Sequence, residues 1–355
     1  MKVLVAMSGG VDSSVAAKLL ADSGHECVGC TMKLYENEDA AAARGKTCCT
    51  LDDAEDARSV AYKLGMPFYV FNFKDDFREK IIGRFVRSYL EGKTPNPCID
   101  CNRYMKFDKL YERASLLGCS HIATGHYARV IEENGVYKLK KALDPDKDQS
   151  YVLYSLTQEQ LGRTLFPLGE YRKTDIRKIA DEAGFLNAAK PDSQDICFVP
   201  DGNYAALIEK ITGETPAAGD YVDEDGKVIG RHKGLIRYTI GQHKGLGMPF
   251  PDKMYVLRLD KKQNRVVLGP SESLFSTEVR AGGFNWIAGK APNGPFRCKA
   301  KIRYRQKEQW ATVTPEGEDR VLIVFDEPQR AVTPGQAAVL YDGDEVLGGG
   351  EIEAV

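Results

Sequence analysis

Apolar and polar positions in the first half of the chain follow two alternating periods. Compact apolar runs of strand length recur, and the stretches between them carry apolar residues at every third or fourth position, the spacing of one face of a helix. The runs predict strands at 2–7, 26–32, 68–73 and 121–124, and the helical spacing predicts helices at 14–20, 52–64, 77–90 and 106–117. This alternation indicates an α/β domain, with a parallel sheet covered by helices on both faces.

The pattern changes after about residue 204, where helical spacing nearly disappears. Short apolar runs at 256–259, 265–268, 297–304 and 321–325 are separated by Gly, Pro and Asp turns. Runs of this kind predict a β-rich portion made of two small units. The Gly282-Gly283 pair and the prolines at 292 and 295 predict a joint before the last unit.

Composition limits the class of protein. The 355 residues are 28% charged and 43% hydrophobic, as in a soluble globular protein of two or three domains. No apolar run approaches the roughly 18 residues of a membrane span, and the apolar N-terminus is too short for a signal peptide. The net charge of −2 means that any nucleic-acid binding must use local basic patches. Nine cysteines without a secretory signal predict a reducing, cytoplasmic location.

The segment after the first strand has the composition of an anion-binding loop. Ser8, Gly9 and Gly10 follow the apolar run, and two serines open the next helix. Glycine lets backbone N–H groups approach an anion, and the amino end of a helix favours negative charge. Asp12 would be a ligand for Mg²⁺ on bound phosphates. An ordinary turn with a capped helix is the alternative, and both the Walker A ending and the G-x-G-x-x-G fingerprint are missing.

Two cysteines lie in polar surroundings that suit a reactive thiol. Cys101 belongs to a stretch at 94–102 whose prolines predict an extended conformation, and Cys197 follows the polar run 192–195. Thiolate is the reactive form, so each would need a nearby positive group or helix end. For either cysteine alone, a buried apolar thiol is the simpler interpretation.

Seven motifs in a fixed order extend this picture along the chain. They are S-G-G-x-D-S at 8–13, N-P-x-x-x-C-N at 96–102, A-T-G-H-Y at 123–127, K-D-Q-S-Y at 147–151, D-S-Q-D-I-C-F at 192–198, G-Q-H-K-G-L-G at 241–247 and R-Y-R-Q at 303–306. The first resembles the pyrophosphate loop of the N-type ATP pyrophosphatase superfamily. The ordered set resembles the tRNA-specific 2-thiouridylase family over essentially the whole chain.

This resemblance implies a fold and an activity. The fold would be an ATP pyrophosphatase domain of the adenine nucleotide alpha hydrolase type at 1–204, a small central β domain at 205–277 and a C-terminal β-barrel at 278–355. The enzyme would use ATP to adenylate the 2-carbonyl of the wobble uridine of tRNA and would replace the oxygen with sulfur, releasing AMP and pyrophosphate. Its partners would be tRNA and a sulfur-donor protein, either a persulfide relay protein or a cysteine desulfurase.

The resemblance also implies residue roles. Cys197 would carry the persulfide, and Cys101 would be the nucleophile that helps release sulfide or forms a disulfide with Cys197. The implied ATP contacts are Ala6, Met7, Ser8, Gly9, Gly10, Val11, Asp12, Ser13, Met32 and Gly125. Those to the target base are Asn96, Pro97 and Cys98, and those to tRNA are His126, Lys147, Asp148, Gln149, Arg303, Tyr304, Arg305 and Gln336. For His126, a structural side chain after a strand is the alternative.

One position departs from the family pattern. Many members carry Asp, often given an acid/base role, where this chain has Cys98, and the nearby Asp100 cannot be assumed to replace it. Cys98, Cys101 and Cys197 could together hold a 4Fe–4S cluster with one open iron position, a competing way to carry sulfur. The plainer alternative is that Cys98 is a passive thiol. A zinc site that also uses Cys48-Cys49 is weaker, because adjacent cysteines rarely ligate one tetrahedral metal.

A basic alternation near the C-terminus predicts a surface for RNA. Lysine or arginine occupies every second position of 299–307, at Lys299, Lys301, Arg303, Arg305 and Lys307. On a strand these side chains would share one face at a spacing of about 7 Å, similar to that of backbone phosphates, and Tyr304 would add a stacking surface. A solvated strand face is the alternative.

Two other functions stay open. One is an ATP pyrophosphatase that acts on a small molecule, such as an amidating synthetase, although this leaves Cys101, Cys197 and the basic strand without a purpose. The other is an RNA-binding or metal-binding protein without turnover, which leaves the phosphate loop unexplained. AMP formation that depends on tRNA would distinguish the three.

Overall fold

The structure is a computed structural model that describes residues 1–35, 51–190, 196–199 and 201–354. Its N-terminal part is built on a five-stranded sheet in the order β3-β2-β1-β4-β7, in which every pair is parallel. The strands are β1 (Lys2–Ala6), β2 (Glu26–Lys33), β3 (Phe68–Asn72), β4 (His121–Thr124) and β7 (Thr164–Leu165). The parallel α/β sheet predicted from the apolar runs is confirmed.

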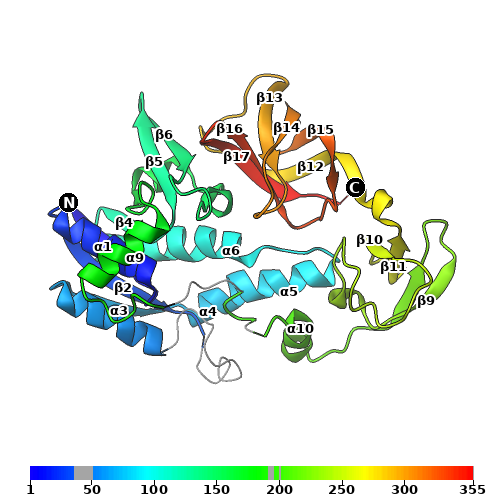
Figure 1. The fold of residues 1–355 in the computed structure, drawn as a ribbon, viewed down its shortest axis with the longest axis horizontal. Coiled ribbons are helices and arrows are strands. Elements are labelled where there is room, and N and C mark those ends of the chain that lie inside the picture. Colours follow the sequence, from blue (N-terminus) through cyan, green and yellow to red (C-terminus); the bar gives the residue numbers. More distant parts are fainter. Residues whose placement is uncertain (36–50, 191–195, 200, 355) are drawn as a thin grey trace.

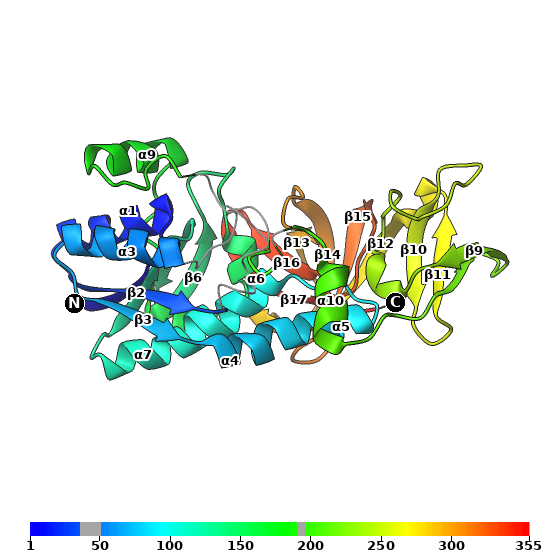
Figure 2. The ribbon, with the colours of Figure 1, turned by 90° about the horizontal axis from the view of Figure 1, so that it is seen from below.

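Helices cover both faces of this sheet (Figure 2). One face packs on α1 (Val11–Asp22), α3 (Leu51–Lys63) and α9 (Lys173–Glu182), through a core that includes Val3, Val5 and Met7 of the first strand and loop. The other face carries a second core with Leu4 and Ile122. The helices packed on that core are α4 (Lys74–Phe77), α6 (Pro97–Asp100) and α7 (Leu110–Leu116), with π-helical segments at Arg78–Ile82 and Cys101–Lys109. The next helix after the first π-helical segment, α5 (Gly83–Leu90), packs in a separate core with α10 (Tyr204–Thr212).

The helix that carries Cys101 begins well before the predicted residue 106. Asn96 is its N-cap, and the Asn96 side-chain oxygen accepts a hydrogen bond from the Cys98 N–H at 3.2 Å. Pro97 occupies the first turn, where a missing N–H costs nothing and the fixed φ favours the helix. The prediction that the prolines keep 94–102 extended is therefore wrong for 97–102, which are helical.

The C-terminal part is a closed barrel. Its strands are β12 (Phe275–Trp286), β13 (Phe296–Lys301), β14 (Gln309–Pro315), β15 (Val321–Arg330), β16 (Ala337–Asp342) and β17 (Glu345–Ile352). β12 pairs with both β15 and β17, which closes the ring. The predicted joint at Gly282-Gly283 is wrong, because this pair lies inside β12 where it passes from one partner to the other. Gly283 has a φ of +55° there.

A hairpin from the N-terminal part extends the barrel sheet. It consists of β5 (Ala128–Glu133) and β6 (Val136–Lys141), and β6 pairs with β17 at Lys140 and Glu345. Residues 219–269 form a smaller sheet of order β10-β11-β8-β9, which lies at the end of the molecule opposite the five-stranded sheet (Figure 1). It contains β8 (Gly219–Val222), β9 (Val228–His232), β10 (Tyr255–Asp260) and β11 (Arg265–Gly269), preceded by α10 (Tyr204–Thr212).

Short segments complete the described chain. They are α8 (Gln158–Gly162) and 3-10 turns at Ser150–Leu153, Leu235–Arg237 and Ser271–Leu274. Among the residues described, no helix has the length and apolar character needed to cross a membrane.

Candidate active site

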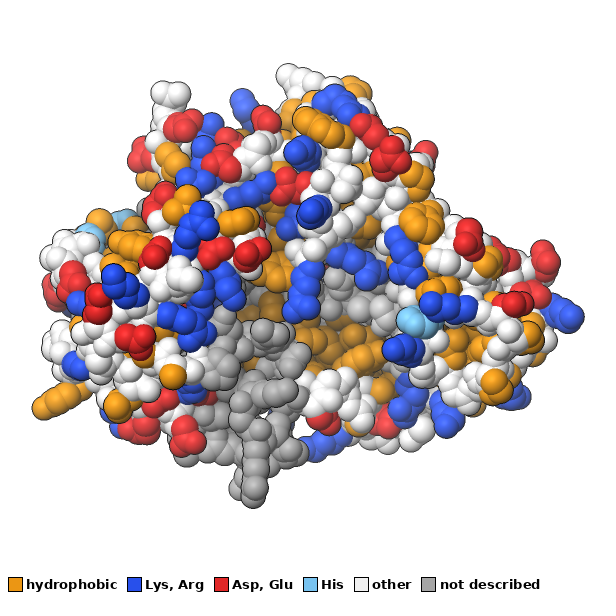
Figure 3. Space-filling view, viewed as in Figure 1, with side chains coloured by type: hydrophobic (Ala, Val, Ile, Leu, Met, Phe, Trp, Pro, Cys, Tyr) orange, Lys and Arg blue, Asp and Glu red, His pale blue; other side chains and the backbone are white. Residues whose placement is uncertain are grey.

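A cleft of about 1110 Å³ lies between the carboxyl ends of β1, β2 and β4 and one side of the barrel. Ligands of open α/β sheets bind at this end of the strands. Lys and Arg side chains gather around the hollow in the middle of the face drawn in Figure 3. The predicted site residues that line the cleft are Ala6, Met7, Ser8, Gly10, Val11, Asp12, Ser13, Met32, Gly125, His126, Lys147, Asp148, Gln149, Tyr304 and Arg305.

Close backbone approaches shape the loop at 8–13, which the sequence predicts to be a phosphate loop. Gly9 has a φ of +76°, and a Cβ there would lie 2.3 Å from the Asp53 carbonyl oxygen, so only glycine fits. A Cβ on Gly125 would lie 2.8 Å from the Ser13 backbone nitrogen, so this glycine brings the end of β4 against the amino end of α1. Gly10 caps α1 without a side chain, which leaves N–H groups of the first turn for an anion.

Lys173 is a site residue that sequence analysis missed. Its ammonium lies 2.8 and 2.7 Å from the two carboxylate oxygens of Asp12, and the Tyr127 hydroxyl donates to the same carboxylate at 2.7 Å. Lys173 is only 8% exposed, which is unusual for a lysine and matches its pairing with a carboxylate. Lys173 stands 161 positions from Asp12, so no local pattern could have paired them.

His126 lines the cleft but is buried. Its Nδ1 lies 2.7 Å from the Thr124 hydroxyl and its Nε2 lies 3.3 Å from the Lys106 ammonium. Burial, and secondly the Lys106 charge, lowers the pKa of His126 well below its usual value. An ammonium has only donors, so Nε2 of the neutral ring accepts and the proton is on Nδ1, which donates to Thr124.

The three candidate cysteines lie outside the set of cleft-lining residues. Cys98 is exposed, and Cys101 and Cys197 are half-buried against the same hydrophobic core. The seven described cysteines form no disulfide. Phe198, next to Cys197, packs edge-on against Phe77 and Phe85, with ring centroids 5.7 and 5.1 Å apart. Cys48, Cys49 and the motif residues 192–195 lie outside the described residues.

A three-cysteine cluster site is not formed here. In the described portion of the chain, no three His, Cys, Asp or Glu side chains are grouped so that they could hold a metal ion. Cys98, Cys101 and Cys197 therefore do not fit the ligand set of a 4Fe–4S cluster in this arrangement.

Asp100 is occupied elsewhere. It forms an ion pair with Arg84 at 3.2 Å and does not line the cleft. Burial raises the pKa of the Asp100 carboxyl, although Arg84 opposes the shift. Cys98 is exposed and, like Asp100, does not line the cleft. The Asp100 carboxylate is thus held by Arg84 outside the cleft.

The basic alternation at 299–307 is only partly a strand. β13 ends at Lys301 and the chain then turns, so the prediction of one continuous strand face is wrong. The Arg303 guanidinium donates to the Ala331 carbonyl oxygen at 2.8 Å and to the Thr333 hydroxyl at 3.0 Å, and Arg303 does not line the cleft. Lys299, Lys301, Arg305 and Lys307 do line it.

Two residues that were predicted to contact tRNA, Gln336 and Tyr304, form hydrogen bonds between the barrel and the N-terminal part of the protein. The Gln336 amide donates to the Thr94 carbonyl oxygen at 2.7 Å, which joins the barrel to the segment before α6. The Tyr304 hydroxyl donates to the Asp148 carbonyl oxygen at 3.2 Å, across the cleft from barrel to α/β domain. Asn96 and Pro97 start α6 and, like Gln336, do not line the cleft.

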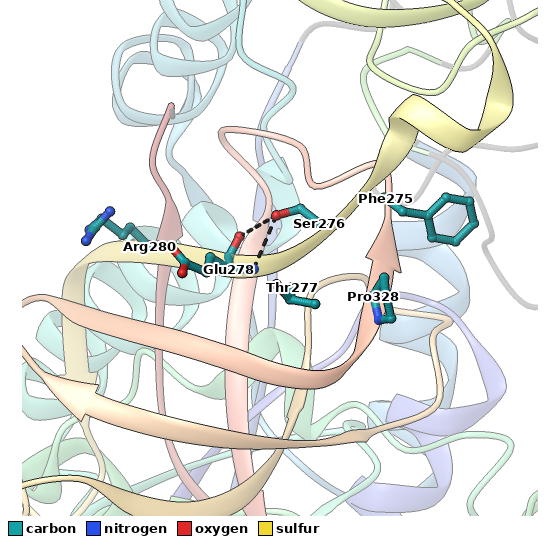
Figure 4. Close-up of a pocket in the computed structure, with 6 residues that line it drawn as sticks. All are labelled: Phe275, Ser276, Thr277, Glu278, Arg280 and Pro328. Atoms are coloured by element: carbon teal, nitrogen blue, oxygen red, sulfur yellow. Dashed lines mark hydrogen bonds between the residues drawn. The ribbon is translucent and has the colours of Figure 1, made fainter.

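A second depression, of about 440 Å³, lies on the barrel (Figure 4). Glu278 and Arg280 are its charged residues, and the Ser276 hydroxyl donates to the Glu278 carbonyl oxygen at 3.0 Å. It offers no convergent set of groups for chemistry, so the cleft is the candidate active site.

The fold and cleft define a nucleotide-binding α/β enzyme class with two appended β domains. Residues 1–201 match the family described as tRNA methyl transferase HUP domain. Residues 206–270 match a tRNA methyl transferase PRC-barrel domain, and residues 276–352 match an aminomethyltransferase beta-barrel domain. The α/β, central β and C-terminal barrel fold is thus confirmed, while the boundaries at 204 and 277 stay predictions.

Full-length relatives make the assignment more specific. The tRNA-specific 2-thiouridylase MnmA of Clostridioides difficile (strain 630) is 51% identical over 99% of this chain and 98% of its own. MnmA of Acetivibrio thermocellus is 48% identical over 99% of both chains. The chain belongs to the tRNA-specific 2-thiouridylase family. Among solved structures, a 4-thiouridine synthetase–RNA complex with bound ATP is a distant likeness, 17% identical with a TM-score of 0.38 over 59% of this chain and 50% of that one.

Proposed function

We propose that this protein is a tRNA 2-thiouridylase that adenylates the 2-carbonyl of a tRNA uridine and replaces its oxygen with sulfur. The cleft is the observation that carries the proposal. One wall is a phosphate loop at the amino end of α1, and the other is a basic barrel surface with an exposed tyrosine, Tyr304. ATP suits the first wall, and an RNA backbone with an unstacked base suits the second.

The phosphate loop would hold the pyrophosphate of ATP. Backbone N–H groups near Gly10 and the hydroxyls of Ser8 and Ser13 are donors on this wall. Attack of the uridine O2 on the α-phosphorus forms one P–O bond and breaks the bond to the β-phosphate, so pyrophosphate leaves. Asp12 fits a Mg²⁺ ligand in chemistry and place, and Mg²⁺ would offset the phosphate charge when bound.

Sulfur would then replace the adenylated oxygen. The terminal sulfur of a Cys197 persulfide attacks C2 and AMP leaves, which links Cys197 to the base through a disulfide. The Cys101 thiolate attacks the Cys197 sulfur, which forms a Cys101–Cys197 disulfide and leaves C2=S on the uridine. A dithiol reductant must then restore both thiols. Both cysteines are partly buried against one large hydrophobic core, which joins the α/β domain to the barrel.

A sulfur-donor protein would load Cys197, either a persulfide relay protein or a cysteine desulfurase. The half-exposed state of Cys197 is compatible with such delivery. We derive no step through an iron–sulfur cluster, because the described ligands do not gather into such a site. The cytoplasmic location stays a prediction.

Mass spectrometry of nucleosides tests the function directly. Wild-type protein incubated with tRNA, ATP–Mg²⁺, a persulfide donor and a dithiol reductant should produce 2-thiouridine derivatives and AMP, both dependent on tRNA. Cys101→Ser and Cys197→Ser should each abolish thiolation with a persulfide donor. AMP formation without tRNA would instead favour a synthetase acting on a small molecule, and normal sulfur incorporation by Cys197→Ser would refute the carrier role.

A further inference from the structure

A lysine on the cysteine-bearing helix reaches the nucleotide side of the cleft. Lys106 lies in the π-helical segment Cys101–Lys109 and lines the cleft. In a π-helix the N–H of residue i+5 bonds to the carbonyl of residue i, so Lys106 follows Cys101 by one hydrogen-bonded turn. π-Helical turns inside α-helices are rare and are frequently found at functional sites.

The surroundings of Lys106 fix its position without neutralising its charge. Its ammonium contacts Nε2 of the neutral His126 at 3.3 Å, and the His126 ring lies 6.1 Å from Phe107 and 5.9 Å from Phe166, centroid to centroid. Thr124 fixes the other side of the imidazole at 2.7 Å. In the part of the chain that the structure describes, no carboxylate lies within ion-pairing distance of Lys106.

The neighbours of Lys106 also place it at the junction of the two half-reactions. His126 follows Gly125, whose missing side chain allows β4 to touch the amino end of α1 near the phosphate loop. On the other side, the helix leads back to Cys101. The α-phosphate must occupy such a junction, because it bonds first to pyrophosphate and then to the uridine oxygen.

We propose that Lys106 is a catalytic residue that binds a non-bridging oxygen of the α-phosphate, in ATP and in the adenylated uridine, and that His126 is the positioning residue which holds it there. The proposal rests on the proposed adenylation chemistry. When sulfur displaces AMP, the phosphate changes from a monoanionic diester to a monoester and gains negative charge. A fixed ammonium with two remaining donors stabilises that charge.

The nucleotide AMP and the nucleoside adenosine separate this role from a structural one, since they differ only in the phosphate. Wild-type protein should bind AMP more tightly than adenosine in calorimetric titration. Lys106→Met should weaken AMP binding by about 10- to 100-fold, the effect of one charged hydrogen bond, and leave adenosine binding unchanged. His126→Ala should weaken AMP binding in the same way, and His126→Gln, which keeps an acceptor for Lys106, should recover part of it.

Lys109→Met is the matched control. Lys109 lies on the same helix but is paired with Asp76 and Glu112, at 3.6 and 3.2 Å, outside the cleft. This variant should bind AMP as the wild type does. Equal AMP affinity in Lys106→Met and wild type, or a wild type that binds AMP and adenosine equally, would overturn the proposal. Neither result depends on thiolation. If only the proposed function were wrong, the wild type would form no 2-thiouridine, but Lys106→Met would still bind AMP more weakly than the wild type does.

Discussion

At the scale of single residues, a buried lysine holds the carboxylate of the phosphate loop. Lys173 and Tyr127 together bind Asp12, so the carboxylate has one fixed orientation before any nucleotide arrives. An Asp12 left without the ammonium would lie half-buried beside phosphates of the same sign. Lys173 therefore acts on the cleft through the orientation of Asp12.

Lys173→Met should lower the free energy of unfolding by about 1–3 kcal/mol, because it leaves a partly buried carboxylate without its cation. It should also reduce tRNA-dependent AMP formation strongly. Denaturant unfolding and AMP release measure the two effects. Lys178→Met is the control, because Lys178 on the same helix is largely exposed and pairs with the exposed Glu182 at 3.8 Å. Equal behaviour of the two variants would contradict the role of Lys173.

Prediction from sequence works at this scale where the chemistry is local. Glycines and serines between a strand and a helix identify an anion site without any knowledge of the rest of the chain, and Ser8, Gly10 and Asp12 do line the cleft. No local sequence motif identifies Lys173 or Lys106 as part of the site. Their positions follow from packing between elements far apart in sequence, which periodicity does not encode.

At the scale of elements, the helix from Pro97 to Leu116 carries both Cys98 and Cys101 and, further along, the cleft-lining Lys106. It runs through α6, the π-helical segment and α7, and Asn96 caps it. Sequence analysis misplaced its start because proline was taken as an extended residue, whereas in the first turn it favours the helix. The error matters for chemistry, since Cys98 and Cys101 stand about one helical turn apart rather than along an extended strand.

Asn96→Ala should cost about 1 kcal/mol of stability, the usual effect of losing an N-cap. Because the cap fixes the start of the helix that carries Cys101, thiolation should also fall by about tenfold or more. Thermal unfolding and 2-thiouridine formation report the two effects. Asn203→Ala is the control. The Asn203 side chain caps α10 by accepting a hydrogen bond from the Ala206 N–H at 3.2 Å, so its loss should cost similar stability without loss of activity. Equal loss of activity in both variants would argue that only stability matters.

The second misplaced element is the basic strand. Alternation in sequence predicted one face from Lys299 to Lys307, but β13 ends at Lys301 and a turn follows. The Arg303 guanidinium donates a hydrogen bond to the Ala331 carbonyl oxygen within the barrel, so Arg303 is a structural residue. The side chains of Arg305 and Lys307 line the cleft. A period of two is shared by strands and by some turns, so composition alone could not separate them.

At the scale of the whole molecule, the cleft exists because the barrel is attached to the α/β domain. The hairpin β5–β6 pairs with β17, and Arg129 forms an ion pair with Asp344 at 2.7 Å. Strands, helices and the order of domains could be predicted from period and turns. The attachment could not, because it joins an N-terminal hairpin to the last strand through contacts of long sequence separation.

The convergence of Cys101 and Cys197 is the claim on which the proposed sulfur transfer depends, and a cross-linking measurement tests it most directly. In a Cys98→Ser background, mild oxidation in the presence of tRNA and ATP–Mg²⁺ followed by peptide mass spectrometry should yield a Cys101–Cys197 disulfide as the main product. Oxidation that leaves both thiols free, or joins them only to other cysteines, would contradict the account.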